Sequence, residues 1–90
     1  MSEYTPVDTT VIAAIATTCQ IDRREVHPEI GVDELGLGSM GLIAVISQLE
    51  VAYDLEFTPE QVVPMLQTRS IREFIGLVEQ AVGPDGPRPT

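Results

Sequence analysis

Residues 34–43 read Glu-Leu-Gly-Leu-Gly-Ser-Met-Gly-Leu-Ile, and within this stretch a glycine-punctuated loop gives way to a long apolar helical run. Ser39 falls at that change. The first N–H groups of a helix have no partner within the helix, and the positive end of the helix dipole lies beside them, so this position favours a phosphate. No catalytic group surrounds the serine in the sequence. The stretch therefore predicts a hydroxyl that another protein modifies, not a nucleophile that attacks substrates itself.

Four helices are predicted from the apolar periodicity and from helix start signals. Thr5-Pro6 and Thr58-Pro59 each place a capping residue before a proline, and Ser70 with Glu73 forms a capping box. The predicted helices begin near residues 6, 39, 59 and 70. The first, second and fourth are expected to end near residues 19, 53 and 82, and Pro64 limits the short third one.

The predicted fold class is all-α, a small four-helix bundle with a long loop at residues 20–38 and a short third helix. That loop is expected to be ordered, and its length is typical of a functional loop. We expect residues 1–5 to be a flexible N-terminus, residues 6–82 to form the domain, and residues 83–90 to be a disordered tail. The side chains expected in the core are Leu42, Ile46, Leu49, Phe57, Val62, Ile71 and Phe74. The loop is expected to be pinned by Val26, Ile30, Val32 and Leu35.

Composition narrows the possible partners and the compartment. The formal net charge is −9, which argues against nucleic acid as a partner and favours basic protein surfaces. No apolar stretch is long enough to span a bilayer, so we expect no membrane partner. One cysteine, Cys19, cannot form an internal disulfide, which suits a reducing cytoplasm. We expect a cytoplasmic monomer.

The predicted second helix is apolar on two sides. At about 100° per residue, Leu42, Val45, Ile46, Leu49 and Tyr53 form a core stripe, and Met40, Ile43, Ala44, Ser47 and Val51 lie opposite. A four-helix domain of this size can hardly cover both sides, so the second stripe is a candidate docking surface. The alternative is that the first helix or the loop covers it. The residues predicted to contact a partner are Leu37, Met40, Ile43, Ser47 and Val51.

Several other motifs are weaker. Residues 36–41 spell G-x-G-x-x-G, but no buried strand or βαβ unit accompanies them, so a dinucleotide site is not expected. A serine hydrolase would need a base, and His27 is the one histidine; it is expected to be a solvated loop residue. Cys19 lies on the apolar stripe of the first helix and is expected in the core. One cysteine and one histidine cannot supply a structural zinc site, so no metal is expected.

Leu35-Gly36-Leu37-Gly38-Ser39-Met40 resembles the Leu-Gly-x-Asp-Ser-Leu signature of acyl and peptidyl carrier proteins. The resemblance extends over about residues 7–82. It includes the acidic pair Asp33-Glu34 before the motif and the segments 48–50 and 53–57, which are similar to the end of the carrier's second helix. It implies that Ser39 is the attachment point of a covalent 4′-phosphopantetheine arm. The implied partners are a phosphopantetheinyl transferase, an acyl- or aminoacyl-loading enzyme and downstream biosynthetic enzymes. The resemblance implies a non-catalytic carrier that holds its cargo as a thioester.

Two departures from the family pattern matter. Gly38 stands where the family usually has an aspartate that helps the transferase to dock. The second helix also has fewer acids than carriers of fatty acid synthesis, which resembles carriers of polyketide or nonribosomal peptide biosynthesis more closely. Amino acid, polyketide and other acyl cargoes all remain open. Two alternatives also remain open: an unmodified helical adaptor with a carrier-like fold, and a small serine esterase.

Overall fold

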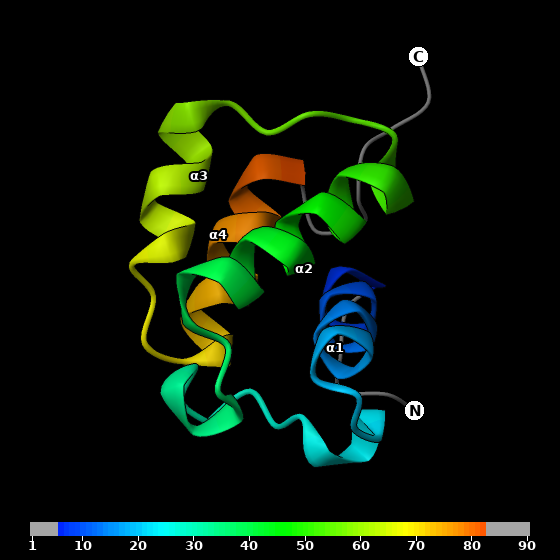
Figure 1. Cartoon of the computed structure of the whole chain (residues 1–90). Coiled ribbons are helices and arrows are strands. Elements are labelled where there is room, and N and C mark those ends of the chain that lie inside the picture. Colours follow the sequence, from blue (N-terminus) through cyan, green and yellow to red (C-terminus); the bar gives the residue numbers. More distant parts are fainter. Residues whose placement is uncertain (1–5, 83–90) are drawn as a thin grey trace.

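The computed structural model describes residues 6–82, and these form four α-helices. Their bounds are α1 Pro6–Cys19, α2 Gly38–Tyr53, α3 Pro59–Leu66 and α4 Ile71–Val82. α2 packs on α1 and α3, and α4 also packs on both of these helices. In Figure 1, α1 and α3 lie on opposite sides of α2, and α3 is the shortest of the four described α-helices. The all-α prediction and the four helices are confirmed.

The capping residues predicted within residues 6–82 form the expected hydrogen bonds at the starts of their helices. Thr58 Oγ1 accepts the Gln61 N–H at 3.3 Å, and Gln61 Oε1 accepts the Thr58 N–H at 2.9 Å. This reciprocal box fixes the start of α3. Pro64 lies inside α3, which continues to Leu66. The predicted cap at Thr5, the flexible segment 1–5 and the tail 83–90 lie outside the described residues.

The core is a single apolar cluster to which all four helices contribute. Six of the predicted core side chains are buried, whereas Val62 is half-buried and packs against the cluster. Cys19 is half-buried too, because it lies at the last turn of α1, where its Sγ contacts the Leu35 carbonyl oxygen at 3.8 Å. The buried predicted side chains are Leu42, Ile46, Leu49, Phe57, Ile71 and Phe74.

The loop between α1 and α2 contains two 3₁₀ helices that were not expected from the sequence, η1 (Arg23–Glu25) and η2 (Asp33–Leu35). Val26 and Val32 are buried, and Ile30 and Leu35 pack against the core. All four side chains that were predicted to anchor the loop therefore do so. Between residues 6 and 82 the structure has no β-strand; an isolated bridge pairs Gly31 with Ser70. A dinucleotide-binding βαβ unit is therefore missing from the described part of the chain.

Candidate functional site

Ser39 is the second residue of α2, and it is exposed. The first bond within the helix joins the Gly41 N–H to the Leu37 carbonyl oxygen at 2.9 Å. Leu37 precedes the helix and offers no side-chain cap. The N–H groups of residues 38–40 therefore lie in the first turn without an intrahelical acceptor, as at every helix start. The Ser39 hydroxyl makes no hydrogen bond within residues 6–82.

Two glycines set the direction of the chain just before Ser39. Gly36 has φ +70° and Gly38 has φ +57°, both in the left-handed region that L side chains rarely adopt. They flank Leu37, which is 5% exposed and belongs to the core. The chain thus turns inward, buries one leucine, and turns outward again to present Ser39.

The burial of Leu37 corrects one of the predicted partner contacts. Its side chain lies beneath the first turn of α2, where a Cβ added at Gly41 would approach the Leu37 Cδ2 and Cβ atoms to 3.1 and 3.2 Å. Gly41 therefore allows this close packing. Leu37 anchors the site from inside and is not available on the surface that a partner would meet.

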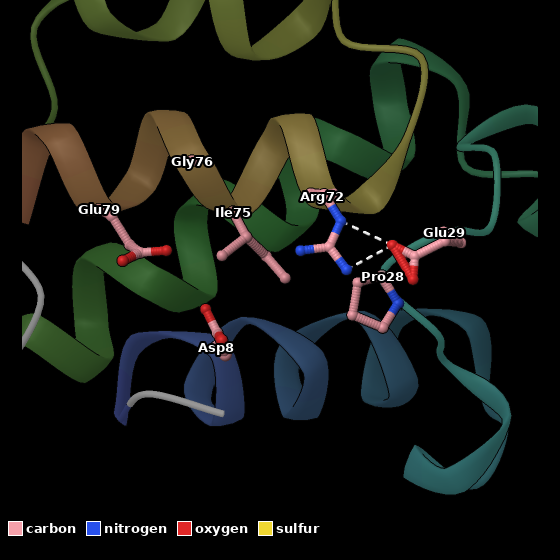
Figure 2. A pocket seen from close by; sticks show the side chains of 7 residues that line it. All are labelled: Asp8, Pro28, Glu29, Arg72, Ile75, Gly76 and Glu79. Atoms are coloured by element: carbon pink, nitrogen blue, oxygen red, sulfur yellow. Dashed lines mark hydrogen bonds and ion pairs between the residues drawn. The ribbon is translucent and has the colours of Figure 1, made fainter. Parts of the chain in front are cut away.

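The segment that leads to the site is fastened to the start of α4. The Arg72 N–H donates to the Pro28 carbonyl oxygen at 2.8 Å, and the Val32 N–H donates to the Arg69 carbonyl oxygen at 2.8 Å. Figure 2 shows the Arg72 guanidinium paired with Glu29. An exposed ion pair contributes little, so the backbone bonds carry most of this attachment. They fix residues 28–32, and thereby the approach to Ser39.

An exposed stripe runs along α2 from the residue after Ser39. Met40 is 80% exposed, Ile43 43% and Val51 83%. Ala44 and Ser47 are exposed between them. The alternative, in which the first helix or the loop covers this side of α2, is therefore wrong. The opposite side of α2 is buried, as its periodicity predicted.

The remaining candidate residues do not join Ser39. His27 is exposed and lines a hollow with Arg23 and Arg24, and the structure shows no contact between His27 and Ser39. A serine esterase would therefore lack its base. Burial raises the pKa of the Cys19 thiol, which makes it less reactive. Over the described residues, no group of three or more metal-ligating side chains is present, and no helix is long and apolar enough to cross a membrane.

Two charged features were missed in the sequence. Asp22 and Glu25 form a capping box for η1, a pattern readable as D-x-x-E, and the hydrogen bonds from Arg24 hold the pKa of Asp22 below its usual range. Asp8 of α1 and Glu79 of α4 point toward one another across a hollow of about 440 Å³ (Figure 2). Burial raises the pKa of Glu79, and the charge and hydrogen bond of Asp8 raise it further. No local signal could have paired these two residues.

The residues at the start of α2 fit a bulky anionic group on Ser39. The hydroxyl is exposed, and a Cβ at Gly38 would have nothing within 4 Å, so the space around the serine is open. Unpaired first-turn N–H groups and the helix dipole stabilise negative charge there. No ionisable side chain lies in the first turn of α2 to compete for those groups.

Comparison with known proteins agrees with this geometry. The family model described as "Phosphopantetheine attachment site" matches residues 9–78, well over half of the chain. No curated protein matches the sequence significantly. Members of this family are generally non-catalytic carriers, and they interact with phosphopantetheinyl transferases and with biosynthetic enzymes. The prosthetic group that they carry is 4′-phosphopantetheine. The chain belongs to the phosphopantetheine-binding carrier family.

Proposed function

We propose that Ser39 is the residue that carries the 4′-phosphopantetheine of this carrier. The observation that supports this most directly is the exposed Ser39 hydroxyl on a helix start that no side chain caps. When attached, the group supplies a terminal thiol that holds an acyl or aminoacyl cargo as a thioester. The described residues place no base beside the serine, so a phosphopantetheinyl transferase must activate the hydroxyl.

The contribution of the chain is to bind and orient the phosphate. The N–H groups of Gly38, Ser39 and Met40 are positioned to stabilise its negative charge. Buried Leu37 holds the first turn of α2 in place, and the backbone bonds to α4 hold the preceding segment. The cargo gains effective concentration because a tethered substrate does not have to be captured anew by each enzyme.

The exposed stripe of α2 is the surface that we propose for partner enzymes. It consists of Met40, Ile43, Ser47 and Val51. One charged residue, Glu50, lies within α2, and its Oε2 is already engaged by the Phe57 N–H at 2.9 Å. Contact with this stripe should therefore depend on shape and apolar burial more than on charge, so salt should weaken it little. This character favours a carrier of polyketide or nonribosomal-peptide-type biosynthesis. We propose a monomer, and a cytoplasmic location is supported by the one cysteine, which cannot form an internal disulfide.

The attachment proposal is tested by intact mass. The 90-residue chain is incubated with coenzyme A and a broad-specificity phosphopantetheinyl transferase. We expect a gain of one phosphopantetheine in the wild type and none in Ser39→Ala. Thr17→Ala, which removes an exposed hydroxyl of α1 outside the stripe, should be modified like the wild type. An unmodified wild type would favour a helical adaptor that keeps the fold without the prosthetic group. Modification at another side chain would also overturn the proposal.

The partner surface is tested with the modified carrier and a loading enzyme. Ile43→Asp and Met40→Asp should slow loading at least about tenfold, because a charge on an apolar interface is costly to desolvate. Val63→Asp is the matched control, since Val63 is 53% exposed but lies on α3. Equal losses in all three variants would show that the stripe has no special role.

A further inference from the structure

A second hollow, of about 410 Å³, lies on α1 and on the segment that contains η1. Its lining includes Ile12 and Val26, which are only 7% and 3% exposed and so form an apolar floor. Arg23, Arg24 and His27, all exposed, surround that floor. None of the lining residues belongs to α2 or to the junction at residues 36–41.

The ionisable side chains that line this hollow are all basic. The two acids of the same segment do not line it, because they are used in the capping box of η1. Asp22 accepts the Arg24 backbone N–H at 2.8 Å, and Glu25 Oε2 accepts the Asp22 N–H at 3.1 Å. The Arg24 guanidinium donates to both Asp22 oxygens at 3.2 Å. The guanidinium of Arg23 and the imidazole of His27 have no such partner in the described structure.

This basic rim is unusual in so acidic a chain. The formal net charge is −9, and residues 28–68 contain seven acids and no lysine or arginine. Those acids are Glu29, Asp33, Glu34, Glu50, Asp54, Glu56 and Glu60. Arg72, near the start of α4, is paired with Glu29. A carboxylate is therefore repelled by most of the described surface. At this hollow it would meet Arg23 and His27, whose side chains have no hydrogen-bonded acid within residues 6–82, although the charge of Arg23 also acts on Asp22.

We propose that the hollow docks an acidic segment of a partner protein in which a bulky apolar side chain lies beside two or more carboxylates. The apolar side chain would cover Ile12 and Val26, and the carboxylates would pair with Arg23 and His27, while Arg24 stays bound to Asp22. Because the lining excludes α2, this contact leaves Ser39 and the exposed stripe open. A carrier docked in this way remains attached to one protein while its Ser39 end reaches another, which raises the effective concentration at the second. Only this last consequence rests on the proposed attachment at Ser39.

The probe is a fluorescein-labelled peptide, Asp-Glu-Phe-Leu-Glu-Asp, titrated with the unmodified 90-residue chain and followed by fluorescence anisotropy at low ionic strength. We expect saturable binding that salt weakens. Arg23→Glu should weaken it at least about tenfold. Arg69→Glu, the matched control with the same charge change, lies on the α3–α4 connection outside the hollow and should change the affinity less than about twofold. Replacing Phe-Leu in the peptide by Ser-Ser should also weaken binding.

Three results would overturn this inference. One is binding that does not saturate. Another is an equal loss of peptide affinity in Arg23→Glu and Arg69→Glu, which would indicate that only the overall electrostatic field of the protein attracts or repels the peptide. A third is self-association of the wild type, detected by sedimentation and abolished by Arg23→Glu, which would make a second copy the occupant. Thermal melting of both variants shows whether they fold. Ser39→Ala should bind the peptide like the wild type, so failure of this site is separate from failure of the attachment proposal.

Discussion

Two helices of this domain have a serine at their start, and the two starts are built differently. Ser70 precedes α4, where its Oγ accepts the Glu73 N–H at 3.2 Å and Glu73 Oε1 accepts the Ser70 N–H at 3.1 Å. Ser39 lies one position inside α2, and its hydroxyl takes no part in a cap. The start of α4 is closed by side chains, whereas the start of α2 keeps its N–H groups available. The difference separates a serine that caps its helix from one whose exposed hydroxyl caps nothing, as the proposed attachment at Ser39 requires.

The burial of Leu37 is what holds the uncapped start, and removing it should have the largest effect. Leu37→Ala deletes a side chain that is 5% exposed, and we expect a loss of about 2–5 kcal/mol in the free energy of unfolding. Chemical denaturation measures this loss. Ile43→Ala, which truncates a side chain 43% exposed on the outer face of α2, should stay within about 0.5 kcal/mol. If Leu37→Ala and Ile43→Ala lose similar amounts of unfolding free energy, the Leu37 side chain does not contribute to the core as its burial indicates.

Gly38 should show the next largest effect, through its backbone. At φ +57° an alanine is strained, so Gly38→Ala should cost about 1–2 kcal/mol. Gly38→Asn should cost less, because asparagine tolerates this region better. The space for a side chain is open, so a loss cannot come from a clash. Thermal melting of Gly38→Ala and Gly38→Asn tests this, because backbone strain should destabilise alanine more than the larger asparagine, whereas crowding would do the reverse. If Gly38→Ala is as stable as the wild type, the left-handed φ of Gly38 does not require glycine.

Comparing the two serines directly gives a smaller difference. Ser70→Ala removes a cap and should cost about 1 kcal/mol. Ser39→Ala removes a hydroxyl without a partner at an exposed helical position, so the melting temperature should be unchanged or slightly higher. The same Ser39→Ala protein should lose all modification. If Ser39→Ala destabilises the fold as much as Ser70→Ala, then Ser39 is a structural cap.

The starts of α3 and α4 could be predicted from sequence because their information is local. Thr58 with Gln61 and Ser70 with Glu73 each lie three residues apart, and the structure shows both boxes. The two faces of α2 also followed from periodicity alone. The exposure of Ser39 agrees with its place at the change from loop to helix.

What could not be predicted depends on contacts that are distant in the sequence or on backbone conformation. Leu37 is predicted to contact a partner because it is apolar and lies close to Ser39. In sequence, such a residue looks the same whether its side chain points into the core or out to the surface. Its direction depends on left-handed φ values at Gly36 and Gly38. The attachment of residues 28–32 to α4 likewise uses backbone bonds that no residue pattern specifies.

A pair of glycines tests the packing beneath the first turn of α2. Gly76 lies inside α4 with nothing within 4 Å of an added Cβ, so Gly76→Ala should stabilise the protein by about 0.5–1 kcal/mol. Gly41→Ala gains the same helix propensity but places its Cβ 3.1–3.2 Å from Leu37 atoms. We expect it to be less stable than Gly76→Ala by about 1 kcal/mol. Denaturant titration of the two variants gives the difference, and identical gains would mean that Leu37 is loosely packed.

The smallest expected effect lies at the other end of α4, where Glu79 faces Asp8 of α1. Arg72 and Glu29 line the same hollow, and they are paired with one another. The pKa of Glu79 is raised in the folded state by burial and by Asp8. The folded protein therefore holds this proton more tightly than the unfolded chain does. The associated stability is present below the ordinary pKa of glutamate, about 4.3, and is lost as the pH rises through the raised value.

Glu79→Gln should therefore make stability less dependent on pH between the ordinary pKa of glutamate and the raised pKa of Glu79. It should also leave the protein slightly more stable than the wild type at pH 7. Glu56→Gln, at an exposed acid on the connection between α2 and α3, is the control and should not flatten the profile. Thermal melting across pH 4–7 measures both. Should Glu79→Gln instead be less stable than the wild type at neutral pH, the two carboxylates would not repel one another.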